Sequence, residues 1–90
     1  MKGFVFFKLK KSIDRHLKLS EQAFNKGTDV IYDQTLSRRE KDKKLKEYNT
    51  KSLYHSRVAD FQKDGSMILS KETKKRLYEE CKRKIDESSK

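Results

Sequence analysis

Four basic side chains near the amino terminus have the spacing needed to hold an extended polyanion. They follow one another at intervals of three, four and three residues, at Lys8, Lys11, Arg15 and Lys18. On a helix of 3.6 residues per turn this spacing places all four on one face. The nearby acids Asp14 and Glu21 fall outside that face. We call these four residues the cationic stripe, and we expect it to contact phosphate groups or other anions.

A second basic run follows in the middle of the chain, where basic and acidic residues alternate. The acids Glu40, Asp42 and Glu47 can form ion pairs with the neighbouring lysines. This run is therefore interpreted in two ways: as a surface that binds nucleic acid, or as an exposed helix face that only keeps the protein soluble. Its basic members are Arg38, Arg39, Lys43, Lys44 and Lys46.

Residues capable of catalysis or metal binding are sparse. His16 and His55 are far apart in the sequence, and Cys81 has no second cysteine with which to form a zinc site or a disulfide. A glycine-rich phosphate loop is also absent. The sequence therefore predicts no enzymatic activity, no metal and no cofactor.

The net charge of the chain favours an anionic partner. Twenty-four Lys and Arg face fourteen Asp and Glu, which leaves +10 on 90 residues, and residues 1–27 carry half of that excess. Lysine outnumbers arginine 18 to 6, which favours contacts with phosphates over bidentate recognition of bases. We therefore predict a small basic protein that binds the backbone of DNA or RNA with little sequence specificity.

The aromatic residues at the amino terminus support an alternative function. A domain of this size cannot bury Phe4, Phe6 and Phe7 completely, and exposed aromatic rings mark docking surfaces. The alternative is a small, phage-type inhibitor or adaptor that docks on a host protein, an acidic protein or a ribonucleoprotein. The small core also makes a homodimer plausible. The single cysteine and the shortness of every apolar run predict a cytoplasmic protein without a transmembrane segment.

The elements that position these residues are predicted to form one small α+β domain over residues 1–90. We expect it to be mainly helical, with two or three short strands at 4–7, 29–32 and 67–69, where apolar residues are continuous. A helix capped by Ser12 is expected to end at Gly27. An all-α bundle of three or four helices is the alternative fold.

The remaining helices are predicted from their capping residues. Ser37 and Glu40 form a capping box, so a helix should begin at Arg38 and end at Gly65, with a kink or a new start at Asn49-Thr50, where its apolar phase changes. Ser70 should cap a last helix that frays from about residue 87. Its predicted inner face consists of Leu77, Tyr78, Cys81 and Ile85. The chain's tyrosines could stack on unpaired bases, but for three of them, Tyr48, Tyr54 and Tyr78, core packing is favoured.

Overall fold

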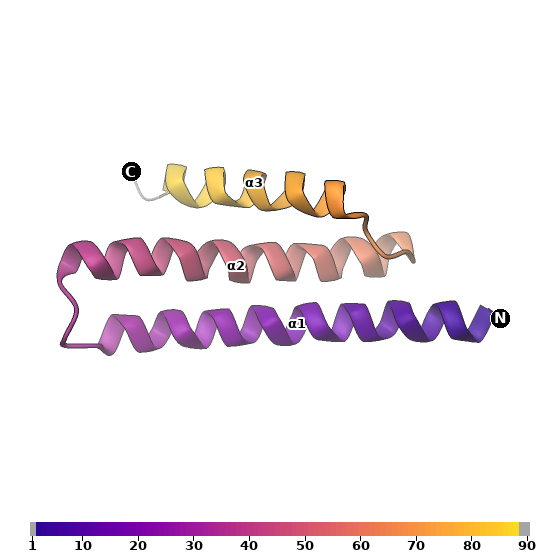
Figure 1. The fold of residues 1–90 in the computed structure, drawn as a ribbon, viewed down its shortest axis with the longest axis horizontal. Helices are drawn as coiled ribbons and strands as arrows, with labels where there is room; N and C mark the ends of the chain where they lie inside the picture. Colours follow the sequence, from indigo (N-terminus) through magenta and orange to yellow (C-terminus); the bar gives the residue numbers. More distant parts are fainter. Residues whose placement is uncertain (1, 89–90) are drawn as a thin grey trace.

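The described part of the chain consists of three α-helices joined by short connections. A computed structural model describes the backbone of residues 2–88 and the side chains of residues 6–88. Helix α1 spans Lys2–Tyr32, α2 spans Arg38–Gly65 and α3 spans Lys71–Ser88. Helix α2 lies in the middle and runs antiparallel to both neighbours (Figure 1). The molecule is elongated, with extents of 53 × 22 × 17 Å.

The expected α+β class is wrong, and the three-helix alternative is the fold observed. No residue from 2 to 88 lies in a strand. The segments 4–7 and 29–32 belong to the first and last turns of α1, while 67–69 connects α2 to α3. A short apolar run fits a buried strand and a buried helical turn equally well, and only the neighbouring residues decide between them. Here the first two runs continue the repeat of a single helix.

Helix α1 continues through two positions that were expected to bound it. Ser12 lies in mid-helix and caps nothing. Gly27 is buried against α2, where a methyl group added to its Cα would meet the Cβ of Tyr48 at 3.7 Å and Leu45 at 3.8 Å. Gly27 therefore lies inside the helix and within the α1–α2 interface instead of ending the helix, and the space beside it admits a methyl group.

Helices α1 and α2 pack along a seam of small and polar residues. Four of the five buried residues that the structure describes in α1 recur every seventh position, at Leu9, His16, Ala23 and Val30, and the fifth is Gly27. A repeat of seven is typical of helices that pair along their length, as in coiled coils. Side-chain hydrogen bonds join the two helices at Ser12 with Gln62, His16 with His55, and Ser20 with Ser52. Lys41 Nζ of α2 also donates a hydrogen bond to the Ile31 carbonyl of α1 at 3.1 Å.

Helix α3 packs on another face of α2. Val58, Leu77 and Cys81 form a small core there, to which Leu53, Tyr54 and Leu69 add partly buried side chains. The predicted inner face of the last helix is confirmed at its two buried positions, Leu77 and Cys81. The phase change in α2 is also explained, because one face of this helix contacts α1 and the other contacts α3. A new helix start at Asn49-Thr50, one of the two forms expected there, is wrong, since α2 runs through this point as one helix.

The predicted helix starts are confirmed by the capping geometry. Ser37 Oγ accepts a hydrogen bond from the Glu40 amide at 3.2 Å, and Ser70 Oγ accepts one from the Thr73 amide at 3.2 Å. Helix α2 ends at Gly65 as predicted, and Ser66 adopts the left-handed conformation with φ of 52°. Helix α3 runs to Ser88, past the expected fraying point, and residues 89–90 lie outside the described part.

Candidate nucleic-acid interface

A pocket of about 660 Å³ lies where the first half of α1, the middle of α2 and the start of α3 meet. It contains three cations, of which Lys11 and Arg15 come from α1 and Lys74 comes from α3. Polar side chains of α1 and α2 complete it. The lining residues are Lys11, Ser12, Arg15, His16, Leu19, His55 and Lys74.

A second hollow of about 360 Å³ adjoins this pocket and shares Lys74 with it. Its walls are Tyr54 of α2 together with Lys71, Lys75 and Tyr78 of α3. The two tyrosine rings meet edge to face, with their centroids 5.3 Å apart. We call the pocket and the hollow together the basic groove, because they share Lys74 and both are lined by basic side chains.

The charge of the basic groove is uniform in sign. Among the described residues, no carboxylate lines either of its parts. Ion pairs lie elsewhere, between Lys51 and Glu47 on α2 and between Lys84 and Glu80 on α3. Lys11 is oriented by an aromatic ring, since its Nζ lies 4.9 Å from the centroid of Phe7. Clustered cations without carboxylates of their own attract an external anion.

Two histidines from neighbouring helices lie side by side in the pocket. Nδ1 of His16 is 2.9 Å from Nδ1 of His55, so one imidazole donates a hydrogen bond and the other accepts it. His16 is only 8% exposed. Burial, followed by the charges of Lys74, His55 and Arg15, lowers the pKa of His16 to about 4. At neutral pH this side chain is therefore uncharged, and the lysines and Arg15 supply the positive charge of the pocket.

Burial also lowers the pKa of His55, with Lys51, Lys74 and Arg15 contributing in the same direction. The ring of Tyr54 packs beside both histidines, at centroid distances of 4.9 Å to His55 and 6.4 Å to His16. The polar floor of the groove is therefore continuous with its aromatic part.

Sequence reasoning found one wall of this groove and missed the rest. Lys11 and Arg15 of the cationic stripe line the pocket, and Lys8 and Lys18 are exposed farther along the same helix in either direction. Lys74 was missed because its position depends on how α3 docks. For Tyr54 and Tyr78 the sequence favoured core packing over stacking on bases; Tyr54 does pack on the core, and both tyrosines also line the groove. The spacing of Lys71, Lys74, Lys75 and Tyr78 on one helix was the available signal.

The second basic run lies away from the groove. Its residues lie on the first turns of α2, next to the α1–α2 connection, whereas the groove begins near the middle of that helix. The fold therefore does not bring the run together with the cationic stripe. The residues concerned are Arg38, Arg39, Lys43, Lys44 and Lys46.

Helix α1 also exposes apolar side chains. Phe6 is 68% exposed and Phe7 56%, while the side chain of Phe4 lies outside the described residues. Three more exposed apolar residues recur at intervals of seven, and we call them the apolar stripe: Leu17, Phe24 and Ile31. Each immediately follows a buried residue of the seam, so the apolar stripe flanks the surface that packs on α2.

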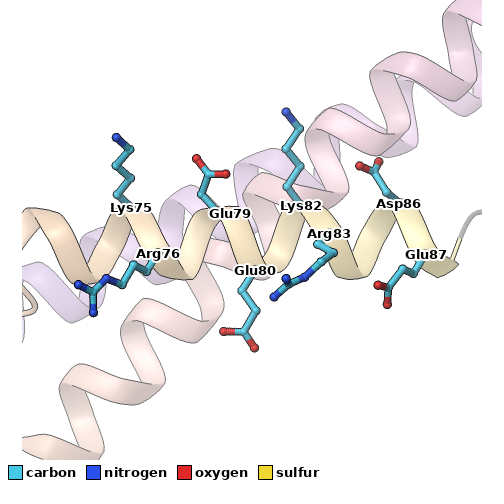
Figure 2. Close-up of a pocket in the computed structure, with 8 residues that line it drawn as sticks. All are labelled: Lys75, Arg76, Glu79, Glu80, Lys82, Arg83, Asp86 and Glu87. Atoms are coloured by element: carbon cyan, nitrogen blue, oxygen red, sulfur yellow. The ribbon is translucent and has the colours of Figure 1, made fainter.

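Another hollow, of about 710 Å³, lies along α3 alone and is not a candidate site. Figure 2 shows its side chains projecting to both sides of the helix. Four are basic and four are acidic, and no other helix contributes a wall: Lys75, Arg76, Glu79, Glu80, Lys82, Arg83, Asp86 and Glu87. Charges of both signs at such close spacing neutralise one another, so this surface favours neither an anion nor a cation.

Comparison with family models, curated proteins and solved structures found no match. Within residues 2–88, no group of three or more potential metal ligands comes together. None of the three described helices is both long and apolar enough to cross a bilayer. The basic groove and the apolar stripe are thus the two surfaces from which function can be argued.

Proposed function

We propose that this protein binds nucleic acid through the phosphate backbone, with little sequence preference, in the basic groove. The observation that carries the proposal is the arrangement of Lys11 and Arg15 on α1 and Lys74 on α3 around one pocket without carboxylates among its described lining residues. Cations that neutralise backbone phosphates release condensed counterions, and this release supplies most of the affinity of non-specific binding.

The composition of the groove favours a single strand over a duplex. Tyr54 and Tyr78 line its second part beside three lysines, and aromatic rings next to cations let unpaired bases stack while their phosphates are held. Stacking on an aromatic ring is tolerant of sequence, because every base has a π face. The preponderance of lysine adds to this tolerance, since lysine contacts phosphates as a point charge.

The dependence of affinity on salt tests the proposal. Fluorescence anisotropy with a labelled single-stranded oligonucleotide, measured over a range of NaCl concentrations, gives the slope of log K against log salt. Contacts with about five phosphates predict a slope of about −3.5 on a single strand. Binding that does not change with salt would contradict the proposal.

A matched pair of double variants locates the binding surface. Arg15→Gln with Lys74→Gln removes two charges from the groove, and Arg38→Gln with Lys43→Gln removes two charges from the start of α2. We expect the groove variant to lose about tenfold in affinity and to have a shallower slope by about 1.4, and the control to lose much less. Equal losses would contradict a location in the groove alone and would support the prediction that the second basic run takes part, and no loss in the groove variant would exclude the groove as the interface.

Docking on another protein is the second candidate function, and the apolar stripe favours it. Large exposed apolar side chains repeated along one helix are typical of protein interfaces. Tagged protein would be recovered from its native cell after nuclease treatment. Recovery of one partner by the wild type and by Asn25→Glu, but not by Phe24→Glu, would support docking. Loss of every partner on nuclease treatment would favour the basic groove instead.

A further inference from the structure

We propose that the pocket around His16 and His55 binds one phosphate group together with one proton, so that its affinity for the anion rises as the pH falls. The inference deepens the proposed function and rests on it, because the same pocket would hold one phosphate of the bound nucleic acid. It is testable without nucleic acid, since a free oxyanion has the same chemistry.

The pocket presents hydrogen-bond donors from three helices to a single tetrahedral anion. Lys11 and Arg15 reach it from α1 and Lys74 from α3, and both imidazoles line it. Ser12 also lines it, and its Oγ accepts a hydrogen bond from Gln62 Nε2 at 2.9 Å, so the hydroxyl proton is left to be donated. Charge-assisted hydrogen bonds of this kind are the strongest that a protein makes to phosphate.

The geometry of the histidine pair limits it to one added proton. In the neutral pair, one Nδ1–H donates to the other Nδ1 across 2.9 Å, and the donating ring has an unprotonated Nε2. A proton added at that Nε2 leaves the bond between the rings intact. A second proton would place two N–H groups opposite each other at the same short distance. The pair therefore passes from neutral to +1 at little structural cost.

The groups that surround the pair oppose this proton as long as no anion is bound. The charged groups that act on it from the three helices are basic. One of them, Lys51, also forms an ion pair with Glu47, whose Oε1 lies 3.1 Å from its Nζ. The neutral Tyr54 ring completes the surroundings. The cations are Lys11, Arg15, Lys51 and Lys74. A bound anion offsets their field, stabilises the imidazolium and gains a further charged donor in return.

Sulfate is the best probe, because its charge stays constant between pH 5 and pH 8 whereas phosphate itself titrates near neutrality. The sequence contains two histidines, so two imidazole Cε1–H signals can be followed by NMR as the pH is lowered, once in NaCl and once in Na₂SO₄ at equal ionic strength. We expect sulfate to raise the midpoint of at least one histidine by a unit or more. Coincident titration curves would overturn the inference.

Calorimetry gives a second readout. Sulfate binding measured at pH 6 in buffers of different ionisation enthalpy reports the protons taken up, and we expect up to one per anion. The dissociation constant should be lower at pH 5 than at pH 8, by about twofold if the anion raises a pKa of about 4 by one unit and by about tenfold if it raises it by two. An uptake of zero with an affinity independent of pH would overturn the inference, whether or not the protein binds oligonucleotides.

Two variants test proton uptake and anion binding separately. His55→Gln keeps a hydrogen-bonding side chain but removes a titrating ring, so sulfate affinity should lose most of its pH dependence. Arg15→Gln should weaken sulfate binding at every pH while the proton linkage remains. Circular dichroism checks that both variants are folded. If His55→Gln does not fold, the NMR titration of the wild type decides the matter.

The same chemistry can come from an internal phosphodiester or from a terminal phosphate. A 5′-phosphorylated oligonucleotide and its 5′-hydroxyl counterpart, each measured at pH 5.5 and pH 8, distinguish these sources. Because a terminal phosphate itself titrates in this range, the two strands are compared with each other at pH 8, where it is fully ionised. Tighter binding of the phosphorylated strand identifies the terminal group, and equal affinity identifies the backbone. Affinity for both strands that does not change with pH would overturn the inference while leaving salt-dependent binding, and thus the proposed function, in place.

Discussion

The side-chain amide of Gln62 donates a hydrogen bond to Ser12 Oγ at 2.9 Å and thereby joins α2 to α1. Its Oε1 accepts a hydrogen bond from the Leu69 amide at 3.2 Å, which ties the α2–α3 connection to the same side chain. Gln62 has no exposed surface. One buried glutamine of α2 thus links this helix to α1 and to the segment that leads into α3. Its partner Ser12 lines the pocket described above.

Replacing this glutamine with an apolar residue of similar size should destabilise the fold. Gln62→Leu leaves the Leu69 amide without its acceptor and Ser12 without its donor, and each buried polar group that loses its partner costs about 1–3 kcal/mol. We expect the free energy of unfolding in urea to fall by about 2 kcal/mol. Gln22→Leu, on the exposed side of α1, serves as the control and should change it by less than about 0.5 kcal/mol. Equal unfolding curves for the two variants would contradict this role.

Gly27→Ala should stabilise the protein. Gly27 lies inside α1 with ordinary helical geometry, and the added methyl group would meet its neighbours at 3.7 Å or more, which is normal contact. Alanine is favoured over glycine in a helix by about 1 kcal/mol. Urea denaturation should show a gain of about 0.5–1 kcal/mol. Gly27→Leu provides the comparison, because a larger side chain would collide with Tyr48 and Leu45. A loss of stability in Gly27→Ala would mean that the two helices lie closer together than these distances indicate.

Stability should fall as the pH is lowered through the range in which free histidine titrates. The pKa of His16 in the folded protein is about 4, and that of His55 is also lowered from 6.5. The unfolded chain therefore binds more protons than the folded chain at mildly acidic pH, and the folded state loses free energy as the pH drops from 6.5 towards 4. We expect a loss of about 1–2 kcal/mol between pH 7.5 and pH 4.5 in NaCl.

Thermal melts at several pH values check this prediction, with His16→Gln as the matched variant. The glutamine retains a hydrogen-bonding group but cannot titrate, so the melting temperature of the variant should depend less steeply on pH. An identical dependence in both proteins would mean that carboxylates elsewhere are responsible. Sulfate should reduce the acid-induced loss in the wild type, because the bound anion favours the protonated pair.

Cys81 should be unreactive until α3 separates from α2. Its side chain is fully buried against Val58 and Leu77, and burial raises the pKa of the thiol, which further lowers the fraction of reactive thiolate. Alkylation by iodoacetamide at pH 8 should be slow in the native protein, by at least about a hundredfold relative to the chain in urea. Rapid alkylation without denaturant would show that α3 is often undocked.

The helix boundaries set by local chemistry were predictable from the sequence. Ser37 and Ser70 cap their helices through hydrogen bonds to amides three residues away, and such contacts depend on the local sequence alone. The inner face of α3 was predictable for the same reason, because its apolar residues have helical spacing. Local patterns also indicated the cationic stripe, of which Lys11 and Arg15 line the groove.

The seam between α1 and α2 escaped prediction because several of its residues are not large and apolar. Its sevenfold repeat includes His16 and Ala23 beside Leu9 and Val30, and a search for apolar periodicity passes over such positions. Gly27 was predicted to end the helix, because its packing beside Tyr48 joins residues distant in sequence and leaves no local pattern. The pairing of His16 with His55 and the approach of Lys74 likewise depend on tertiary packing.

Helix α3 packs against α2 and, within the described residues, makes no backbone contact with α1. The two walls of the basic groove therefore belong to different packing units, since α1 carries Arg15 and α3 carries Lys74. Docking of α3 on α2 through Val58, Leu77 and Cys81 sets the distance between these walls. A substitution in that small core would thus reshape the groove without altering any residue that lines it.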